Sequence, residues 1–280
     1  TRYPCPAEPG LSSERGLSPV PRGCPAYLSN RILSHIPVKV KSVFVEIRSG
    51  MGYNIKIPIL GGRQMQFTIQ KYLETLKGKR VAVLGIGISN TPLIHMLVGA
   101  GALVTACDRR SRDAFGEELA SLEQQGVTFH LGEDYLEHLE GQNVSFRTPG
   151  MRPDLPQLLE AVKGGSLLTS EMEVFFQTCP CPIIGVTGSD GKTTTTTIIS
   201  ELLKAAGYRV HLGGNIGKPL LPEAEDIRAE DYVVVELSSF QLMTMDISPQ
   251  VAVVTNLAPN HLDMHKSMEE YISAKENIYI

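Results

Sequence analysis

Residues 185–194, with the sequence GVTGSDGKTT, have the residue types and spacing of a loop that binds phosphate. Glycines let backbone N–H groups turn towards anionic oxygens, a lysine adds positive charge, and an adjacent hydroxyl can bind Mg²⁺. The strict pattern has a glycine in place of Val186, so we interpret the segment as a variant loop. The alternative is a plain glycine turn before a helix. The residues expected to bind a nucleotide are Gly188, Ser189, Asp190, Gly191, Lys192, Thr193 and Thr194.

Polar side chains follow other apolar runs in the same half of the chain, where strands are expected to end. Glu236 follows the run 233–235, Asn215 lies in a glycine-rich turn, and Asn256 and His261 follow the run 251–254. Because the carboxyl ends of parallel strands meet at one edge of an open sheet, we expect these side chains to converge. Glu236 is therefore the predicted Mg²⁺ ligand beside the phosphate loop. The alternative is an acidic residue that merely leaves a strand.

Two histidines of this half, His261 and His265, are four residues apart, with Asp263 between them. In a helix, that spacing would place two imidazoles on one face; the alternative is a loop, because the segment follows Pro259. A zinc site needs four ligands, however, and no cysteine or further histidine completes the set. We interpret His261 instead as a single ligand of Mg²⁺.

A second glycine turn occupies residues 85–90, with the sequence GIGISN. It is similar to a dinucleotide-binding turn, except that Asn90 stands in place of the third glycine. Asp108 follows at the end of the next predicted strand, where a carboxylate can accept hydrogen bonds from a ribose or a base. The turn favours a phosphate-bearing nucleotide, with NAD as the less favoured alternative.

These turns require a scaffold of strands and helices. From Thr68 onward, short apolar runs alternate with segments of helical periodicity, which is the pattern of parallel sheets covered by helices on both faces. The expected fold class is α/β, with an N-terminal Rossmann-like parallel sheet followed by a P-loop-type α/β domain. We place the first domain at 66–178 and the second at 179–280, with a linker at 180–182.

The first 65 residues differ from the rest of the chain. Residues 3–25 contain six prolines and show no helical or strand period, so they cannot bury enough apolar surface to offset chain entropy. Residues 38–47 alternate well enough for one strand, but no partner is obvious. We interpret residues 1–65 as a poorly structured leader or a non-native extension, and Met65 as a natural start.

The composition limits the classes of function. The 280 residues are 42% hydrophobic and carry a formal charge of −4, which provides no basic field for nucleic acid. No apolar run reaches about 18 residues, and residues 1–23 have no apolar h-region, so this segment is not interpreted as a secretory signal. The five cysteines do not suggest a disulfide scaffold. We expect a cytoplasmic monomer that binds neither nucleic acid nor membranes.

Together these motifs resemble those of the Mur ligases, over about residues 68–280. The matching segments are 187–194 (TGSDGKTT), 214–217 (GNIG), 236–242 (ELSSFQL), 260–265 (NHLDMH) and 271–275 (YISAK). The phosphate loop alone identifies only the superfamily. The run 238–242, which follows the acidic residue, is similar to that of the members that add D-glutamate.

The resemblance implies ATP-driven amide-bond synthesis for peptidoglycan precursors. The carboxylate of UDP-N-acetylmuramoyl-L-alanine would attack the γ-phosphate of ATP, and the amine of D-glutamate would then displace phosphate from the acyl phosphate. The implied catalytic residues are Lys192, Asn215, His261 and Lys275. Thr193 and Glu236 would hold one Mg²⁺, and His261 a second. Lys275 matches the lysine that the family carbamylates beside the metal, which requires a neutral amine although an unperturbed lysine titrates near pH 10.4.

The same resemblance implies a UDP site at the first glycine turn. The residues expected to bind the UDP-linked substrate are Ile88, Ser89, Asp108, Arg109, Asn215 and Ser238. Backbone groups of the first two would bind the diphosphate, the next two would bind uracil, and Asn215 would line the reacting end of the substrate. Residues 148–150 (TPG) match a substrate-side loop that usually reads Ser-Pro-Gly. Asn90 and Asn260 also differ from the residues common in the family.

Family members carry a third, C-terminal domain that completes the ATP site and binds the incoming amino acid. The sequence stops soon after Lys275, so we expect this chain to be a fragment with little or no ligase turnover. The alternatives are another Mur-type or folylpolyglutamate-type ligase, or a nucleotide-binding module without catalysis. An NAD-dependent oxidoreductase would leave the phosphate loop unexplained.

Overall fold

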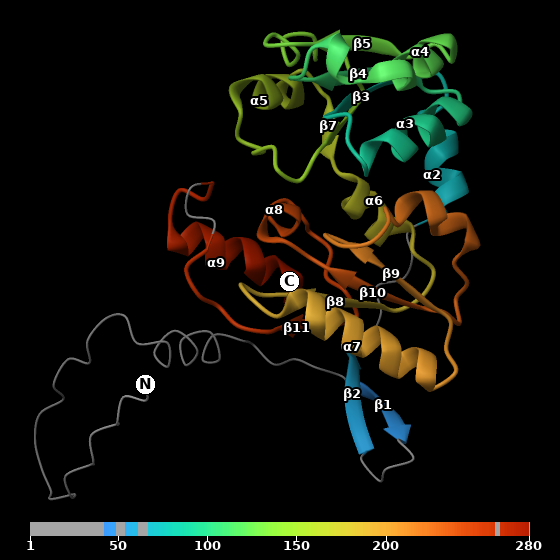
Figure 1. The fold of residues 1–280 in the computed structure, drawn as a ribbon, viewed down its shortest axis with the longest axis vertical. Coiled ribbons are helices and arrows are strands. Elements are labelled where there is room, and N and C mark those ends of the chain that lie inside the picture. Colours follow the sequence, from blue (N-terminus) through green and yellow to red (C-terminus); the bar gives the residue numbers. More distant parts are fainter. Residues whose placement is uncertain (1–41, 49–53, 61–66, 261–263, 280) are drawn as a thin grey trace, which may run out of the picture. The chain divides into compact units, whose positions relative to one another are not determined.

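The computed structural model describes residues 42–48, 54–60, 67–260 and 264–279 (Figure 1). It confirms the predicted α/β class, since two parallel sheets follow one another along the chain. Both sheets lie within the same compact part of the chain, and the domain limits 66–178 and 179–280 stay predictions. Among the described residues, no helix has the length and apolar character needed to cross a membrane.

A two-stranded antiparallel sheet precedes both parallel sheets. Strand β1 (Ser42–Arg48) pairs with β2 (Asn54–Leu60), in a register that runs from Ser42 opposite Leu60 to Arg48 opposite Asn54. The strand expected at 38–47 thus begins later and has a partner that the sequence reasoning did not find. The rest of the predicted leader lies outside the described residues.

The first parallel sheet has the strand order β5-β4-β3-β6-β7. Its strands are β3 (Arg80–Leu84), β4 (Leu103–Asp108), β5 (Thr128–Leu131), β6 (Val144–Arg147) and β7 (Leu167–Thr169). Its helices are α2 (Ile69–Leu76), α3 (Asn90–Gly99), α4 (Gly116–Gln124), α5 (Pro156–Lys163) and α6 (Glu171–Thr178). The predicted glycine turn lies between β3 and α3, so it stands at the carboxyl end of a central strand.

The second parallel sheet has the order β11-β8-β10-β9. Its strands are β8 (Ile183–Thr187), β9 (Val210–Gly214), β10 (Tyr232–Glu236) and β11 (Val251–Val254). Its helices are α7 (Lys192–Ala205), α8 (Ser239–Leu242) and α9 (Met268–Glu276), with 3₁₀ turns at Leu221–Asp226 and Asn277–Tyr279. The inner strands β8 and β10 are almost wholly apolar because protein covers both of their faces.

The register of the inner strands sets the position of the predicted site. Val233 lies beside Ile183, and Glu236 beside Val186. The carboxylate therefore leaves the sheet next to the strand that leads into the phosphate loop, as the spacing of the motifs predicted.

One hydrophobic core connects the two sheets. The same cluster of buried side chains includes Ile69 of α2, Phe146 of β6, Phe175 of α6, Val233 of β10 and Ile278 after α9. Helix α6 takes part because most of its side chains are buried, including Phe175 and Phe176. The two sheets therefore share packing and are not joined only by a linker.

Candidate functional site

The phosphate loop follows β8, and two glycines determine its path. Gly191 (φ +76°) caps α7, whose first residue is Lys192. Gly188 has φ +147°, and a Cβ atom there would lie 2.0 Å from the Thr255 hydroxyl oxygen. No side chain fits at Gly188, because the backbone of the loop passes directly against the segment after β11.

Asn256 anchors the loop from the adjacent strand end. Its side-chain oxygen accepts hydrogen bonds from the backbone N–H groups of Ser189 (3.1 Å) and Asp190 (2.9 Å). The Ser189 hydroxyl donates to the Ala258 carbonyl (2.7 Å) and lies 2.9 Å from the Tyr271 hydroxyl. Ser189 thus fixes the loop internally, and its predicted contact with nucleotide stays a prediction.

Two lysines meet at a single loop carbonyl. Lys192 Nζ donates to the carbonyl oxygens of Gly188 (3.0 Å) and Ser189 (2.9 Å). Lys275 Nζ, from α9, donates to the same Gly188 oxygen (3.0 Å) and to Thr187 Oγ1 (3.2 Å). The structure therefore brings the two predicted catalytic lysines together, although they are far apart in the sequence.

The ammonium group of Lys275 lies in an environment that disfavours its charge. The residue is 3% exposed, and Nζ lies 4.7 Å from the centre of the Tyr271 ring. Burial, followed by the positive charge of Lys192, lowers the pKa of Lys275 to about 8. The neutral amine is therefore accessible near physiological pH.

Glu236, Thr193 and Asn215 form a connected group beside the loop. Thr193 Oγ1 donates to one Glu236 carboxylate oxygen (2.7 Å), and Asn215 Nδ2 donates to the other (3.0 Å). Glu236 is 2% exposed. The backbone at Gly214 (φ +96°) passes so close that a Cβ atom would lie 2.2 Å from the Glu236 carbonyl oxygen. All three residues were predicted, and the structure places them in contact.

A cavity of about 140 Å³ opens between these groups. Its lining residues are Gly188, Lys192, Asn215, Ser238, Ser239, Phe240, Tyr271 and Lys275. Five of these were predicted site residues, namely Gly188, Lys192, Asn215, Ser238 and Lys275. Ser238 also caps α8 by exchanging hydrogen bonds with Gln241.

The predicted histidine site is described only in part, since His261 and Asp263 lie outside the described residues. His265 is buried at 3% exposure, and its Nε2 lies 2.9 Å from Ser239 Oγ. Its ring stacks on Phe240, with 5.0 Å between the centroids. Within the described ranges, no group of three or more His, Cys, Asp or Glu side chains is arranged to hold a metal ion.

The glycine turn of the first sheet is organised by Asp108. One carboxylate oxygen accepts from Ile86 N (2.7 Å) and the other from Arg110 N (2.9 Å), and the Arg110 guanidinium binds both. Burial opposes ionisation, but the hydrogen bonds from Arg110 and Ile86 hold the pKa of Asp108 below its usual value. Asp108 therefore shapes the turn, and its predicted contact with uracil stays a prediction.

The other residues in this turn, together with Arg109 after β4, are either exposed or buried. Ile88 is 86% exposed, and Ser89 and Arg109 are exposed as well, so all three are accessible to a ligand. Asn90 is buried, and its amide donates to the carbonyl oxygens of Gly85 (2.8 Å) and Leu84 (3.3 Å). The asparagine in place of the third glycine thus closes the turn with side-chain hydrogen bonds.

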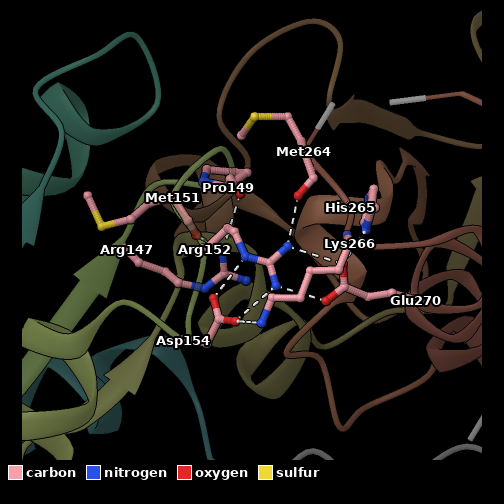
Figure 2. Close-up of polar contacts among 9 residues, drawn as sticks. All are labelled: Arg147, Pro149, Met151, Arg152, Asp154, Met264, His265, Lys266 and Glu270. Atoms are coloured by element: carbon pink, nitrogen blue, oxygen red, sulfur yellow. Dashed lines mark hydrogen bonds and ion pairs between the residues drawn. The ribbon is translucent and has the colours of Figure 1, made fainter. Parts of the chain in front are cut away.

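Two arginines that the sequence reasoning did not select, Arg147 and Arg152, join the first sheet to the second. Figure 2 shows the contacts of Arg152 with Met264 and Glu270. Arg147 is 1% exposed and donates to the carbonyls of Met151 (3.0 Å) and Phe240 (3.1 Å) and to Thr244 Oγ1 (2.6 Å). Burial lowers its pKa, and the negative charge of Glu173 opposes that effect. A charged residue at the end of the buried run 144–147 was the available signal.

Comparison with known proteins finds a matching family model and similar curated proteins. Residues 186–279 match the Mur ligase middle domain. The chain is 52% identical over 215 residues to a UDP-N-acetylmuramoylalanine--D-glutamate ligase of Clostridium botulinum (strain Hall) and 53% identical to that of Clostridium novyi (strain NT). Each match covers 77% of this chain and 47% of the relative, so the chain spans about half the length of these relatives.

A likeness to solved structures is weaker. The crystal structure of UDP-N-acetylmuramate:L-alanyl-gamma-D-glutamyl-meso-diaminopimelate ligase from Neisseria meningitides aligns with a TM-score of 0.46 and 19% identity. The alignment covers 71% of this chain and 67% of that chain.

Proposed function

We propose that this chain, which belongs to the Mur ligase family, forms the nucleotide-binding and UDP-substrate-binding parts of a ligase that adds D-glutamate to UDP-N-acetylmuramoyl-L-alanine with ATP. The observation that carries the proposal is the cavity beside the phosphate loop. Lys192, Asn215 and Lys275 line it, and Glu236 accepts a hydrogen bond from Asn215. A site of this kind brings positive charge to the place where a carboxylate and a triphosphate must meet.

The proposed reaction proceeds in two steps. A substrate carboxylate oxygen attacks the γ-phosphorus of ATP, and the bond to the β-phosphate oxygen breaks, giving an acyl phosphate and ADP. The amine of D-glutamate then attacks the acyl carbon, phosphate leaves, and the amine loses a proton. Both steps bring anionic oxygens together, so Lys192 would stabilise the transferring phosphoryl group electrostatically.

The residues around Glu236 fit a Mg²⁺ ion. The buried carboxylate receives hydrogen bonds only from the uncharged Thr193 and Asn215 among the contacts described, and carboxylate and hydroxyl oxygens are ligands that Mg²⁺ prefers. We propose that Thr193 and Glu236 hold one Mg²⁺, and that His261 with Lys275 holds a second. Bound Mg²⁺ would neutralise charge on the phosphate oxygens.

Lys275 is the proposed site of carbamylation. Its neutral amine would add to CO₂ and release a proton, which converts a cation into a carbamate anion beside the metal. The low pKa of about 8 supports this step, because much more of the amine is neutral near pH 8 than for an ordinary lysine. The contacts with Thr187 and Gly188 hold the amine at the mouth of the phosphate loop.

We propose that the UDP-linked substrate binds at the glycine turn of the first sheet. Exposed backbone at Ile88 and Ser89 would bind the diphosphate, and Asp108 with Arg109 the uracil. The side chain of Thr148 lies against this turn, since a Cβ atom at Gly85 would be 3.2 Å from its methyl carbon. The segment 148–150 therefore borders the same site. Asn215 and Ser238 would line the reacting end of the substrate, and the protein would act as a cytoplasmic monomer.

Titration calorimetry on this 280-residue chain tests the proposal, with ATP and Mg²⁺, UDP-N-acetylmuramoyl-L-alanine and NAD as separate ligands. We expect binding of the first two and none of NAD. The Lys192→Ala variant should lose ATP binding and keep binding of the UDP-linked substrate. Binding of NAD, or ATP affinity unchanged by Lys192→Ala, would contradict the proposal.

A further inference from the structure

Arg152 forms an ion-pair network between the two sheets (Figure 2). It lies just after the segment 148–150 and binds Asp154 of its own segment, with distances of 2.8 and 3.0 Å. The same guanidinium binds Glu270, 118 residues further along the chain, through two parallel contacts of 2.8 and 3.1 Å. Lys266, which precedes Glu270 in the sequence, forms an ion pair with Asp154. A bidentate contact of this kind has a fixed geometry that a point charge would lack.

Glu270 gathers several contacts at the beginning of α9. It lies in the first turn of the helix and also accepts a hydrogen bond from Lys266 N (2.7 Å). His265 Nδ1 lies 3.5 Å from it, and Arg152 further donates to the Met264 carbonyl (2.8 Å). Hydrogen bonds from Arg152 and then from Lys266 N lower the pKa of Glu270 to about 2, so the carboxylate is ionised at neutral pH. Arg152 thus holds both the first turn of α9 and the residues before it.

From this anchored end, α9 reaches the proposed nucleotide site. Tyr271, the next residue after Glu270, has its hydroxyl 2.9 Å from Ser189 Oγ in the phosphate loop. One turn later, Lys275 donates to the Gly188 carbonyl at 3.0 Å. The end of α9 that Arg152 holds therefore lies next to the residues that touch the loop.

We infer that Arg152 is a positioning residue. By binding Glu270, it holds Tyr271 and the remainder of α9 against the phosphate loop. It also connects α9 to the segment 148–150. The inference rests on the proposed function, which assigns ATP to the phosphate loop and places the segment 148–150 at the site for the UDP-linked substrate. An isolated ion pair at a surface contributes little. This one differs because Arg152 is only 19% exposed in its side chain and binds two carboxylates and a carbonyl at once.

A double-mutant cycle with amide hydrogen exchange tests the inference on this 280-residue chain. The variants are Arg152→Met, Glu270→Gln and the two combined. Arg112→Met is the matched control, because Arg112 forms an exposed ion pair with Glu123 of α4, far from α9 in the sequence. We expect Arg152→Met to speed exchange of the α9 amides about tenfold, while exchange in β3 stays unchanged. Glu270→Gln should do the same, and the combination should add little.

Binding of ATP with Mg²⁺, measured by calorimetry, separates positioning from a purely structural role. We expect Arg152→Met to weaken ATP binding about tenfold, although the residue lines no part of the cavity. Faster exchange of the α9 amides in Arg152→Met, with unchanged ATP affinity, would overturn the inference. So would α9 exchange in Arg152→Met that equals the exchange in the Arg112→Met control. Effects of Arg152→Met and Glu270→Gln that simply add in the double variant would overturn it as well. If Arg152→Met fails to fold, Glu270→Gln decides, because it leaves the pair with Asp154 intact. A parent chain that binds no ATP would refute the proposed function, while the exchange cycle still decides whether Arg152 holds α9.

Discussion

The buried ammonium group of Lys275 makes the stability of the protein depend on pH in a defined window. Burial and the charge of Lys192 lower its pKa to about 8, whereas a lysine in the unfolded chain titrates near pH 10.4. The difference between these two pKa values corresponds to about 3 kcal/mol of unfolding free energy, at roughly 1.4 kcal/mol per pH unit. Below about pH 8 both states hold the proton, and the native state bears the whole cost of the buried charge. Between the two pKa values only the unfolded state holds it, so native stability rises with pH.

The Lys275→Met substitution removes this titration. The free energy of unfolding of the parent should therefore rise, relative to that of the variant, by about 2 kcal/mol between about pH 7 and pH 9.5. Urea unfolding at a series of pH values measures the difference, in buffers free of CO₂ so that no carbamate forms. Lys204→Met is the control, because Lys204 lies in an exposed ion pair with Glu201 on α7. Parallel pH curves for the parent and Lys275→Met would refute the argument that this lysine is a buried, destabilising charge.

Three further substitutions have defined outcomes. Arg147→Met should destabilise the protein by about 2 kcal/mol in urea unfolding, because the buried Met151 carbonyl loses the guanidinium that donates to it; equal stability would contradict this. Gly188→Ala should abolish ATP binding in calorimetry, since its methyl group would meet the Thr255 hydroxyl at 2.0 Å; retained affinity would show that the loop can move. Thr193→Val should weaken binding of ATP with Mg²⁺ about tenfold, because Glu236 loses a hydroxyl partner, whereas Thr193→Ser should keep it.

The part of the site that depends on strand ends was predictable from the sequence. Lys192, Asn215 and Glu236 each follow an apolar run or a glycine turn, and parallel strands bring such positions to one edge of the sheet. A role for Lys275 in the site was expected only from the resemblance to a family, and its contact with the loop was not predicted. A lysine inside a helix carries no local signal that distinguishes it from an exposed one.

The contacts between the sheets could not be predicted in this way. Arg152 and Glu270 are 118 residues apart, and neither lies in a periodic pattern that points towards the other. The pairing of the first strand was missed for a different reason. Alternating isoleucines at 55, 57 and 59 were a signal for the partner strand, but the surrounding composition led to the interpretation of a leader without structure.

The hydrophobic core that runs through both sheets has a consequence for biosynthesis. Ile69 and Ile278 belong to the same cluster of buried side chains, although they stand at opposite ends of the described α/β region. While the ribosome is still making the second sheet, the inner faces of α2 and α6 have no permanent cover. The nascent first sheet therefore exposes apolar surface of these helices until the turn Leu221–Asp226, which contacts both of them, has left the ribosomal tunnel. A chaperone that shields such surfaces would have its longest opportunity to bind during that interval.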